Sequence, residues 1–226
     1  MSRIILIETS TALCSTAISE NGRIVSSRRS NEPRAHAAMT APFVKEMLDE
    51  CGWRVQDCDA VCVSMGPGSY TGLRVGVSTA KGLCFGAGIP LLALSTLDVL
   101  ARQAIEAGLP EGCAGILPMV DARRMEVYAA GYSPEGERLT EIAPVVVDAG
   151  SFASMFAKGP VAVIGDAADK CRMLPAASFM QVCPEATAMA VPATARFGKG
   201  EFENVAYFEP FYLKQFVATV SKKNLF

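Results

Sequence analysis

The chain has 226 residues, of which half are hydrophobic and 19% are charged, and its formal net charge is -2. A chain of this length and polarity buries about 70% of its unfolded surface, so we expect packed lobes and not a disordered polypeptide. The slightly acidic balance argues against a stand-alone nucleic-acid-binding protein, which carries a visible basic patch. The dense basic stretches are short pairs such as Arg28-Arg29 and Arg123-Arg124. A role with RNA is therefore expected to depend on a partner protein.

The chain contains eight cysteines and one histidine, His36. No two cysteines have CxxC spacing, and the first residues lack the layout of a secretory signal, so we expect free thiols in a cytoplasmic protein. No apolar run approaches the ~20 residues of a membrane span, so no membrane association is expected. A single histidine excludes a metal site with two histidine ligands, and we expect no tightly bound metal or cofactor.

Hydrophobic periodicity predicts three strands at the start of the chain, followed by alternating helices and strands. Asn21-Gly22 separates the second and third strands, and this dipeptide is the strongest short hairpin signal. The elements expected in the first half are strands at 4–7, 12–19 and 23–26, a helix at 35–51, a strand at 61–64, a helix at 73–85 and a strand at 89–94.

The second half partly repeats this order, although no repeat is visible in the sequence itself. The elements expected there are a helix at 97–108, strands at 114–120, 126–132 and 140–147, a helix at 151–157, a strand at 161–164 and a helix at 184–197. Strands followed by alternating helices and strands indicate an α/β layered fold. We therefore predict two lobes of similar element order, spanning residues 1–98 and 99–226.

The segment 66–72 contains three glycines and a proline between a predicted strand and a predicted helix. Unpaired N–H groups at the start of a helix suit a phosphate, and glycines let the backbone approach a ligand. No Gly-Lys-Ser/Thr sequence follows, so the segment is not a P-loop. Close packing of the helix against a neighbouring strand explains the glycines equally well, and both interpretations stay open.

Two polar turns are further candidates for a ligand site. Glu8-Thr9-Ser10 follows the first strand and could hold a metal–phosphate group, or form an ordinary hydroxyl-rich turn. The mixed charges from Asp121 to Glu126 could bind a ligand, or form a salt-bridged turn that contributes little energy. A cysteine paired with His36 stays open as a nucleophile, but nothing near His36 indicates one, so we expect no catalytic residue in this chain.

Several of these stretches together resemble the TsaB (YeaZ) family. The matching segments are residues 4–11, 64–76, 121–124, 126–128, Gly165-Asp166 and 210–214. The glycine-rich segment that runs into Leu73-Arg74 is the most specific of them. Glu8 stands where the family usually has Asp, and Lys214 stands where it usually has Arg.

The resemblance implies two ASKHA (actin-like ATPase and sugar kinase, ribonuclease H-like) lobes with mixed sheets flanked by helices. It implies a non-catalytic scaffold subunit for threonylcarbamoyl transfer to adenosine 37 of tRNA. The partners implied are a TsaD-type catalytic subunit, a TsaE-type ATPase and a second copy when the chain is alone, with tRNA met through the complex. ATP and Mg²⁺ are candidate ligands within that complex.

The enzyme relative's two metal-binding histidines match Thr96 and Leu100 here, and neither residue replaces an imidazole at a metal. This removes most support from a metallopeptidase. The alternative that stays open is an ASKHA enzyme, either a small-molecule kinase or an ATPase. A remnant nucleotide site is expected at Glu8, Thr9, Ser10, Gly66, Gly68 and Asp121.

The partner surface is expected on the helices at 35–51 and 73–85. Apolar residues recur every four positions on the first helix and small residues do so on the second, so both stripes could meet another subunit or serve the internal core. The expected contact residues are His36, Met39, Phe43, Met47, Gly72, Leu73, Arg74, Gly76, Val77, Ala80 and Lys81. If they form the partner surface, Phe43→Asp and Val77→Asp leave the chain folded and abolish association. If they form the core, both variants unfold.

Overall fold

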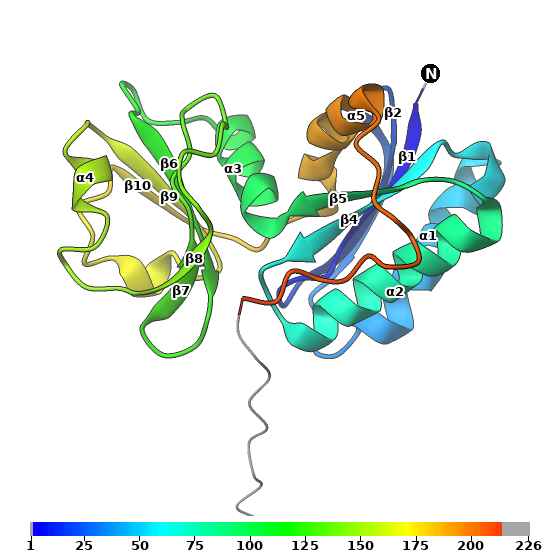
Figure 1. Ribbon diagram of the computed structural model, residues 1–226, viewed down its shortest axis with the longest axis horizontal. Helices are drawn as coiled ribbons and strands as arrows, with labels where there is room; N and C mark the ends of the chain where they lie inside the picture. The colour runs from blue at the N-terminus through cyan, green and yellow to red at the C-terminus, as the bar shows by residue number, and fades with distance from the viewer. Residues whose placement is uncertain (1, 214–226) are drawn as a thin grey trace, which may run out of the picture.

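The structure is a computed structural model that describes residues 2–213. It shows two lobes, each built on a five-stranded mixed sheet, joined where β5 leads into α3 (Figure 1). The first sheet consists of β1 (Arg3–Glu8), β2 (Cys14–Glu20), β3 (Arg23–Ser30), β4 (Ala60–Gly66) and β5 (Leu91–Ser95). The second consists of β6 (Gly115–Asp121), β7 (Glu126–Ala129), β8 (Ala143–Val146), β9 (Val161–Gly165) and β10 (Ser178–Gln181).

The helices are α1 (His36–Cys51), α2 (Tyr70–Ala87), α3 (Thr96–Ala107), α4 (Ala153–Phe156) and α5 (Ala190–Lys199). Short 3-10 turns are η1 (Val55–Asp57), η2 (Asp169–Cys171) and η3 (Ala186–Met189). None of the helices within residues 2–213 is long and apolar enough to cross a membrane.

The two sheets have the same topology. Their strand orders are β3-β2-β1-β4-β5 and β8-β7-β6-β9-β10. In the first sheet β1 pairs antiparallel with β2 and parallel with β4, and in the second β6 pairs antiparallel with β7 and parallel with β9. The predicted fold class of two mixed sheets flanked by helices is therefore confirmed.

The first sheet is covered on both faces. Because successive side chains of a strand point to opposite faces, Ile5 and Ile7 pack toward α1 and α2, whereas Ile4 and Leu6 pack toward η3 and α5. Figure 1 shows α1 and α2 side by side on one face, with α5 on the other. The sequence of a strand that is buried on both faces is a continuous run of apolar residues, and residues 4–7 have that pattern.

The chain returns to the first lobe after it completes the second. Met189 and Ala193 lie in the same core cluster as Ile4 and Leu6 of β1. The predicted division places η3 and α5 in a second lobe of residues 99–226, but these elements fill the face of the first sheet that α1 and α2 leave open. The periodicity of α5 predicted an apolar face and carried no information about which sheet it covers.

The start of helix α2 and the presence of strand β10 differ from the sequence prediction for local reasons. Helix α2 begins at Tyr70, three residues before the predicted start, because Ser69 is its N-cap and the Ser69 hydroxyl accepts a hydrogen bond from the Gly72 amide at 3.3 Å. Strand β10 was not predicted. It has only four residues and lies at the edge of the second sheet, so its sequence has no long alternating pattern.

Candidate functional site

The turn between β1 and β2 lies directly against the start of α2. The Thr9 hydroxyl donates a hydrogen bond to the Gly72 carbonyl at 2.8 Å, and the Ser69 amide donates one to the Ser10 carbonyl at 2.6 Å. Thr9 and Ser10 have no exposed surface. The turn therefore uses the space and one of the amides that a phosphate would need at this helix end.

Three glycines permit this contact. A Cβ atom on Gly68 would lie under 3.0 Å from the Ser10 carbonyl, and one on Gly72 or Gly76 would lie equally close to Thr9 atoms. Real Cβ atoms essentially never show such separations. The glycines at these positions are needed for close packing inside the lobe, which was one of the two interpretations left open by the sequence.

Glu8 ends β1 as a buried carboxyl group. Its Oε1 accepts a hydrogen bond from the Ser10 amide at 2.6 Å, whereas Oε2 has no hydrogen-bond partner among residues 2–213. Burial raises the pKa of Glu8 above its ordinary value, and the charge of Asp166 adds to the rise. No atom of Glu8 is exposed, so a nucleotide-bound metal reaches this carboxyl group only if the lobe rearranges.

Asp121, at the end of β6, lies on the second lobe and is exposed. Its amide donates a hydrogen bond to Asp166 Oδ1 at 2.8 Å, and its carboxylate pairs with Lys170. Lys170 Nζ also donates to the Arg124 and Glu126 carbonyls, at 3.0 and 2.7 Å. The segment 121–126 is therefore a turn that Lys170 stabilises through hydrogen bonds and an ion pair.

Asp166 follows β9 and was not among the predicted site residues. Burial raises its pKa to about 6 from an ordinary value of 3.8, and the nearby Asp121 carboxylate adds to the rise. The repeated topology could have indicated it, because β9 in the second sheet corresponds to β4 in the first, and β4 ends at the predicted residue Gly66.

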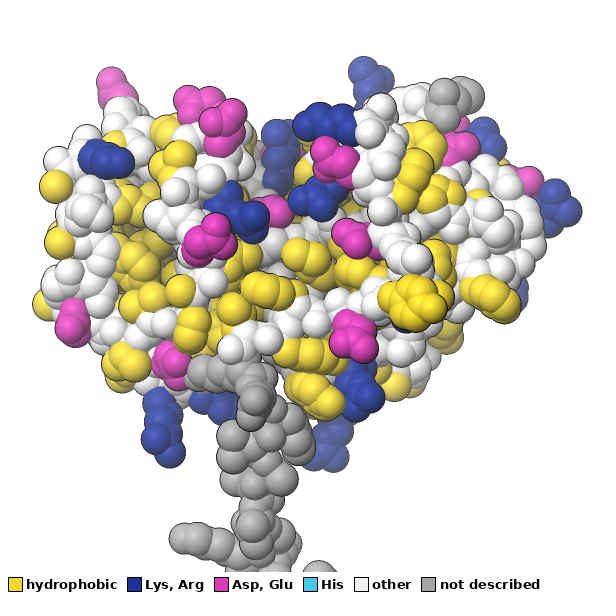
Figure 2. Space-filling model, in the orientation of Figure 1, with side chains coloured by type: hydrophobic (Ala, Val, Ile, Leu, Met, Phe, Trp, Pro, Cys, Tyr) yellow, Lys and Arg dark blue, Asp and Glu magenta, His cyan; other side chains and the backbone are white. Residues whose placement is uncertain are grey.

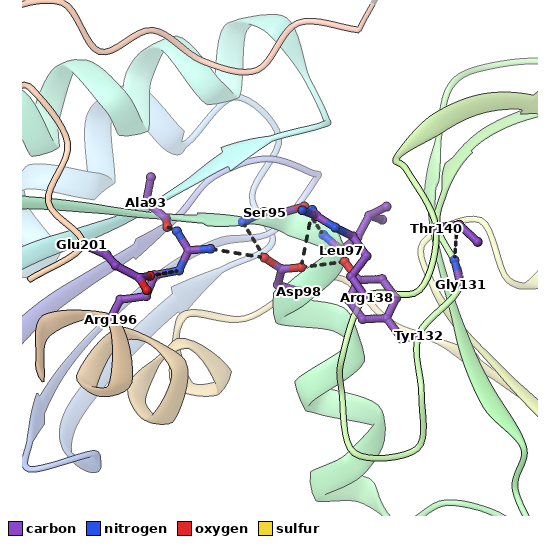
Figure 3. Close-up of polar contacts among 10 residues, drawn as sticks. All are labelled: Ala93, Ser95, Leu97, Asp98, Gly131, Tyr132, Arg138, Thr140, Arg196 and Glu201. Carbon is purple, nitrogen blue, oxygen red and sulfur yellow. Dashed lines mark hydrogen bonds and ion pairs between the residues drawn. The ribbon is translucent and has the colours of Figure 1, made fainter. Parts of the chain in front are cut away.

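Asp98, in the first turn of α3, joins parts of both lobes (Figure 3). Tyr132 of the second lobe donates a hydrogen bond from its hydroxyl to Asp98 Oδ1 at 2.6 Å. Arg138 of the second lobe lies 4.0 Å from the same carboxylate, and Arg196 of α5 lies 3.9 Å from its other oxygen. Burial and the Asp98 charge both raise the pKa of Tyr132. No sequence pattern predicted this cluster, because its members are far apart in the chain.

The stripes predicted as the partner surface point mostly inward. Phe43, Met47, Gly72, Leu73, Gly76, Val77 and Ala80 are buried, His36, Met39 and Lys81 are partly exposed, and Arg74 is exposed. Met47, Val77 and Ala80 belong to the core beneath α1 and α2, as the second interpretation of the stripes expected. An aspartate at Val77 is thus expected to unfold the chain, contrary to the association hypothesis.

His36 and Lys81 have partners within the chain. The His36 Nε2 atom is hydrogen-bonded with the Thr11 carbonyl at 3.0 Å, and Lys81 Nζ donates to the Ala206 and Phe208 carbonyls at 3.2 and 2.9 Å. Within residues 2–213, no group of three or more His, Cys, Asp or Glu side chains could hold a metal ion.

The outer face of α2 has a different stripe of small residues. Ser78, Gly82 and Gly86 are exposed at a spacing of four, and Phe85 beside them is 87% exposed. A Cβ atom on Gly82 or Gly86 would meet no atom of the described residues within 4 Å, so packing within this part of the chain does not require either glycine. Glycine inside a helix is about 1 kcal/mol less favourable than alanine.

The sequence of the chain is similar to a known protein family and to individual members of it. A family model described as TsaD: tRNA N6-adenosine threonylcarbamoyltransferase matches residues 24–207. The tRNA threonylcarbamoyladenosine biosynthesis protein TsaB of Escherichia coli (strain K12) is 37% identical over 130 residues, which are 58% of this chain and 54% of that protein. The chain thus spans about half the length of the curated relatives it matches.

Two solved structures have a similar fold over most of this chain. YeaZ from Pseudomonas aeruginosa has a TM-score of 0.80 at 28% identity, covering 94% of this chain and 100% of that one. The activator of the 2-hydroxyisocaproyl-CoA dehydratase from Clostridium difficile has a TM-score of 0.52 at 12% identity, covering 89% of this chain and 98% of that one. The second likeness concerns the fold alone.

Proposed function

The chain belongs to the TsaD tRNA N6-adenosine threonylcarbamoyltransferase family, in its TsaB (YeaZ) branch, and on that premise we propose that it is a non-catalytic scaffold subunit for forming threonylcarbamoyladenosine at adenosine 37 of tRNA. In this role it binds a TsaD-type catalytic subunit and a TsaE-type ATPase, and it pairs with a second copy when alone. ATP, Mg²⁺ and tRNA then act within the complex, in the cytoplasm.

One observation carries the non-catalytic part of the proposal. The β1–β2 turn fills the space at the start of α2, where Thr9 and Ser10 contact the three close-packed glycines. A phosphate at this helix end would need to displace the Ser10 carbonyl from the Ser69 amide. The buried Glu8 carboxyl group, whose pKa is raised, is also a poor ligand for Mg²⁺, which binds ionised carboxylates.

We place the partner contact on the outer face of α2. Phe85 is a large aromatic side chain left almost fully in solvent, and the neighbouring Gly82 and Gly86 let another backbone approach. The hollow beside Phe85 is lined by Lys81, Gly82, Phe85, Asn204, Val205 and Ala206. An exposed apolar feature of this kind is typical of a protein contact.

Capture of the partner tests this surface. Phe85→Asp is expected to abolish co-purification with a TsaD-type subunit, because a carboxylate would be desolvated at the centre of the contact. Val146→Asp is the matched control, since Val146 is 69% exposed on β8 of the other lobe, and it should keep wild-type capture. Equal capture by both variants would place the contact elsewhere.

The proposed role itself is tested in cells depleted of their own TsaB-type protein. Expression of this chain should restore threonylcarbamoyladenosine, measured by mass spectrometry of tRNA nucleosides. The isolated chain should show no appreciable ATP hydrolysis. Turnover that is present in the wild type and lost in Glu8→Gln would instead favour the alternative of an ASKHA kinase or ATPase.

A further inference from the structure

The chain crosses between the two lobes twice within residues 2–213. It leaves the first lobe where β5 leads into α3, and it returns between β10 and η3 (Figure 1). Gln103 of α3 holds the return segment: its Nε2 donates a hydrogen bond to the Cys183 carbonyl at 3.1 Å, and its Oε1 accepts one from the Glu185 amide at 2.9 Å. Both crossings therefore lie against α3, and short segments at the ends of elements are where lobes rotate relative to each other.

Helix α3 is packed mainly on the second sheet. Leu100 and Ala104 lie in one core cluster with Ile116 of β6 and Ile164 of β9. Val99, in contrast, reaches the core cluster of the first lobe. A rotation of the lobes about the two crossings would therefore carry α3 with the second sheet, and contacts from α3 to the first lobe would oppose it.

Asp98 makes such a contact at the start of α3. Its Oδ2 accepts a hydrogen bond from the Ser95 amide at 3.3 Å, and its Oδ1 accepts one from the Tyr132 hydroxyl at 2.6 Å. Arg138 and Arg196 lie 4.0 and 3.9 Å from the carboxylate (Figure 3). We call Asp98 and these three side chains the Asp98 cluster. The Tyr132 bond is short, whereas both arginine distances exceed the roughly 2.7–3.2 Å of a direct hydrogen bond.

Arg196 is the side chain of the Asp98 cluster that comes from the first lobe. It extends from α5, and its NH1 atom donates a hydrogen bond to the Ala93 carbonyl of β5 at 2.8 Å. Glu201 lies 3.8 Å from its Nε atom. These contacts hold Arg196 on the first lobe, so the Asp98–Arg196 pair joins the two lobes. Figure 2 shows basic and acidic side chains gathered along the boundary between the lobes, where α3 and α5 lie in Figure 1.

The Asp98–Arg196 pair is loose and partly open to solvent. The two side chains are 24% and 32% exposed. A partly exposed ion pair changes an equilibrium by about two- to fivefold, and dissolved salt weakens it. A contact of this strength can form and break, whereas the buried residues of α3 stay packed on the second sheet.

We propose that the Asp98–Arg196 ion pair holds the two lobes at one angle, and that its release lets the lobes open about the two crossings. The Tyr132 and Arg138 contacts of Asp98 lie within the body that α3 forms with the second lobe, so they persist when the lobes open. Ionic strength shifts this equilibrium, because the pair that bridges the lobes is the exposed one. The inference goes beyond the proposed function, which assigns no movement to the lobes.

The test is single-molecule fluorescence energy transfer in the full chain, at concentrations too low for self-association. Dyes are attached through p-azidophenylalanine in place of Tyr207 on the first lobe and Val146 on the second, which are 83% and 69% exposed. Asp98→Asn keeps an acceptor for the Tyr132 hydroxyl and removes the charge, so the ratio of open to closed molecules should rise about fivefold. Raising NaCl from about 0.05 to 0.5 M should open the wild type and leave Asp98→Asn unchanged.

Three further variants locate the effect in the pair that bridges the lobes. Arg196→Gln should open the lobes as Asp98→Asn does, and the double variant should open them no further, because both changes remove one pair. Arg138→Gln should leave the ratio unchanged, since its pair lies within one body. Arg102→Gln is the matched control, because it removes the 2.8 Å pair with Glu106 on the same helix, which joins no lobes.

A distribution of transfer efficiencies that is the same in the wild type, Asp98→Asn and Arg196→Gln would overturn the proposal. Additive opening in the double variant would do so too, as would equal opening in Arg102→Gln. If Asp98→Asn does not fold, Arg196→Gln and the salt series of the wild type decide the question in the same way. No partner is present, so these outcomes are separate from the capture and complementation tests of the scaffold role.

Discussion

The two lobes share one sheet topology but differ in how much helix covers it. The first sheet carries α1 and α2, of 16 and 18 residues, whereas the corresponding connections of the second lobe contain α4, of four residues, and the three-residue turn η2. The second sheet still has both faces covered, by α3 on one side and by Phe152, Met155 and Phe156 near α4 on the other. A sheet of this topology is therefore buried with far less helix than the first lobe contains.

The long helices α1 and α2 give the first lobe a helical outer surface, which the short α4 and η2 do not supply in the second lobe. Inner positions of α1 and α2 bury core residues such as Met47 and Val77, and outer positions leave Phe85 and Gly82 in solvent. In the second lobe the polar turn at Asp121, Asp166 and Lys170 is the more distinctive feature. The partner contact that we propose therefore lies on the lobe with the larger helical layer.

The largest effect is expected from a charge placed in the helical layer. Val77→Asp puts a carboxylate at a side chain that is 4% exposed, and should lower the free energy of unfolding by more than about 4 kcal/mol. Met155→Asp is the counterpart in the second lobe, where Met155 is partly buried, and should lower it by about 2 kcal/mol. Urea unfolding of both variants measures the two losses. A larger loss in Met155→Asp than in Val77→Asp would contradict the expectation that the helical layer of the first lobe tolerates a charge less well.

A smaller effect is expected at the two strand-end glycines. Gly165 has φ +133, and a Cβ atom there would lie under 3.0 Å from the Met119 carbonyl, whereas a Cβ on Gly66, at φ +110, would lie 3.0 Å from Leu73 and Phe211 atoms. Gly165→Ala should therefore lower the melting temperature more than Gly66→Ala, with losses of about 3 and 1–2 kcal/mol. Gly82→Ala is the control and should stabilise the chain by up to about 1 kcal/mol.

The last effect depends on pH. Because the pKa of folded Asp166 is raised to about 6 by burial, from an ordinary value of 3.8, the folded chain binds more protons than the unfolded chain between these values. The free energy of unfolding should then fall as pH rises from about 4 to 6. Asp166→Asn keeps an acceptor for the Asp121 amide and should be more stable than the wild type at pH 8, by about 1–3 kcal/mol.

Melting temperatures measured from pH 4 to pH 8 check this expectation. The slope of the wild type across the window should be shallower in Asp166→Asn, and Glu8, whose pKa burial also raises, should supply part of the slope that remains. Glu141→Gln, which removes an exposed carboxylate from the same lobe, should keep the slope. A lower stability of Asp166→Asn than of the wild type at pH 8 would contradict this prediction, because it would mean that the ionised Asp166 carboxylate stabilises the fold.

Sequence pattern predicted most elements of both sheets, because strands such as residues 4–7 and 161–164 are continuous apolar runs. It could not say which face of α2 is outward, since Gly76 and Gly82 are both small residues on one helix. The difference comes from Thr9, which packs against Gly76, whereas no described residue lies within 4 Å of a Cβ atom placed on Gly82. The position of the β1–β2 turn in the folded lobe therefore decides that the stripe with Gly76 faces inward and the stripe with Gly82 faces outward.

The candidate site was predicted less fully than the fold. Glu8 and Asp121 were singled out correctly as polar residues at strand ends, but their burial and exposure depend on contacts with segments far along the chain. The Asp98 cluster depends entirely on such contacts, because Tyr132 and Arg196 approach it from different elements. Local periodicity carries no information on these pairings.

The return of η3 and α5 to the first sheet has a consequence for synthesis on the ribosome. The residues of β1 that face α5, Ile4 and Leu6, are synthesised before the second lobe, and their cover at Met189 and Ala193 is synthesised after it. The second lobe is complete at β10, before that cover arrives. In nascent chains, one face of the first sheet therefore stays uncovered until α5 has emerged, and exposed apolar surface of this kind favours aggregation or binding by a chaperone. The first lobe can therefore complete its core only after the second lobe has been synthesised.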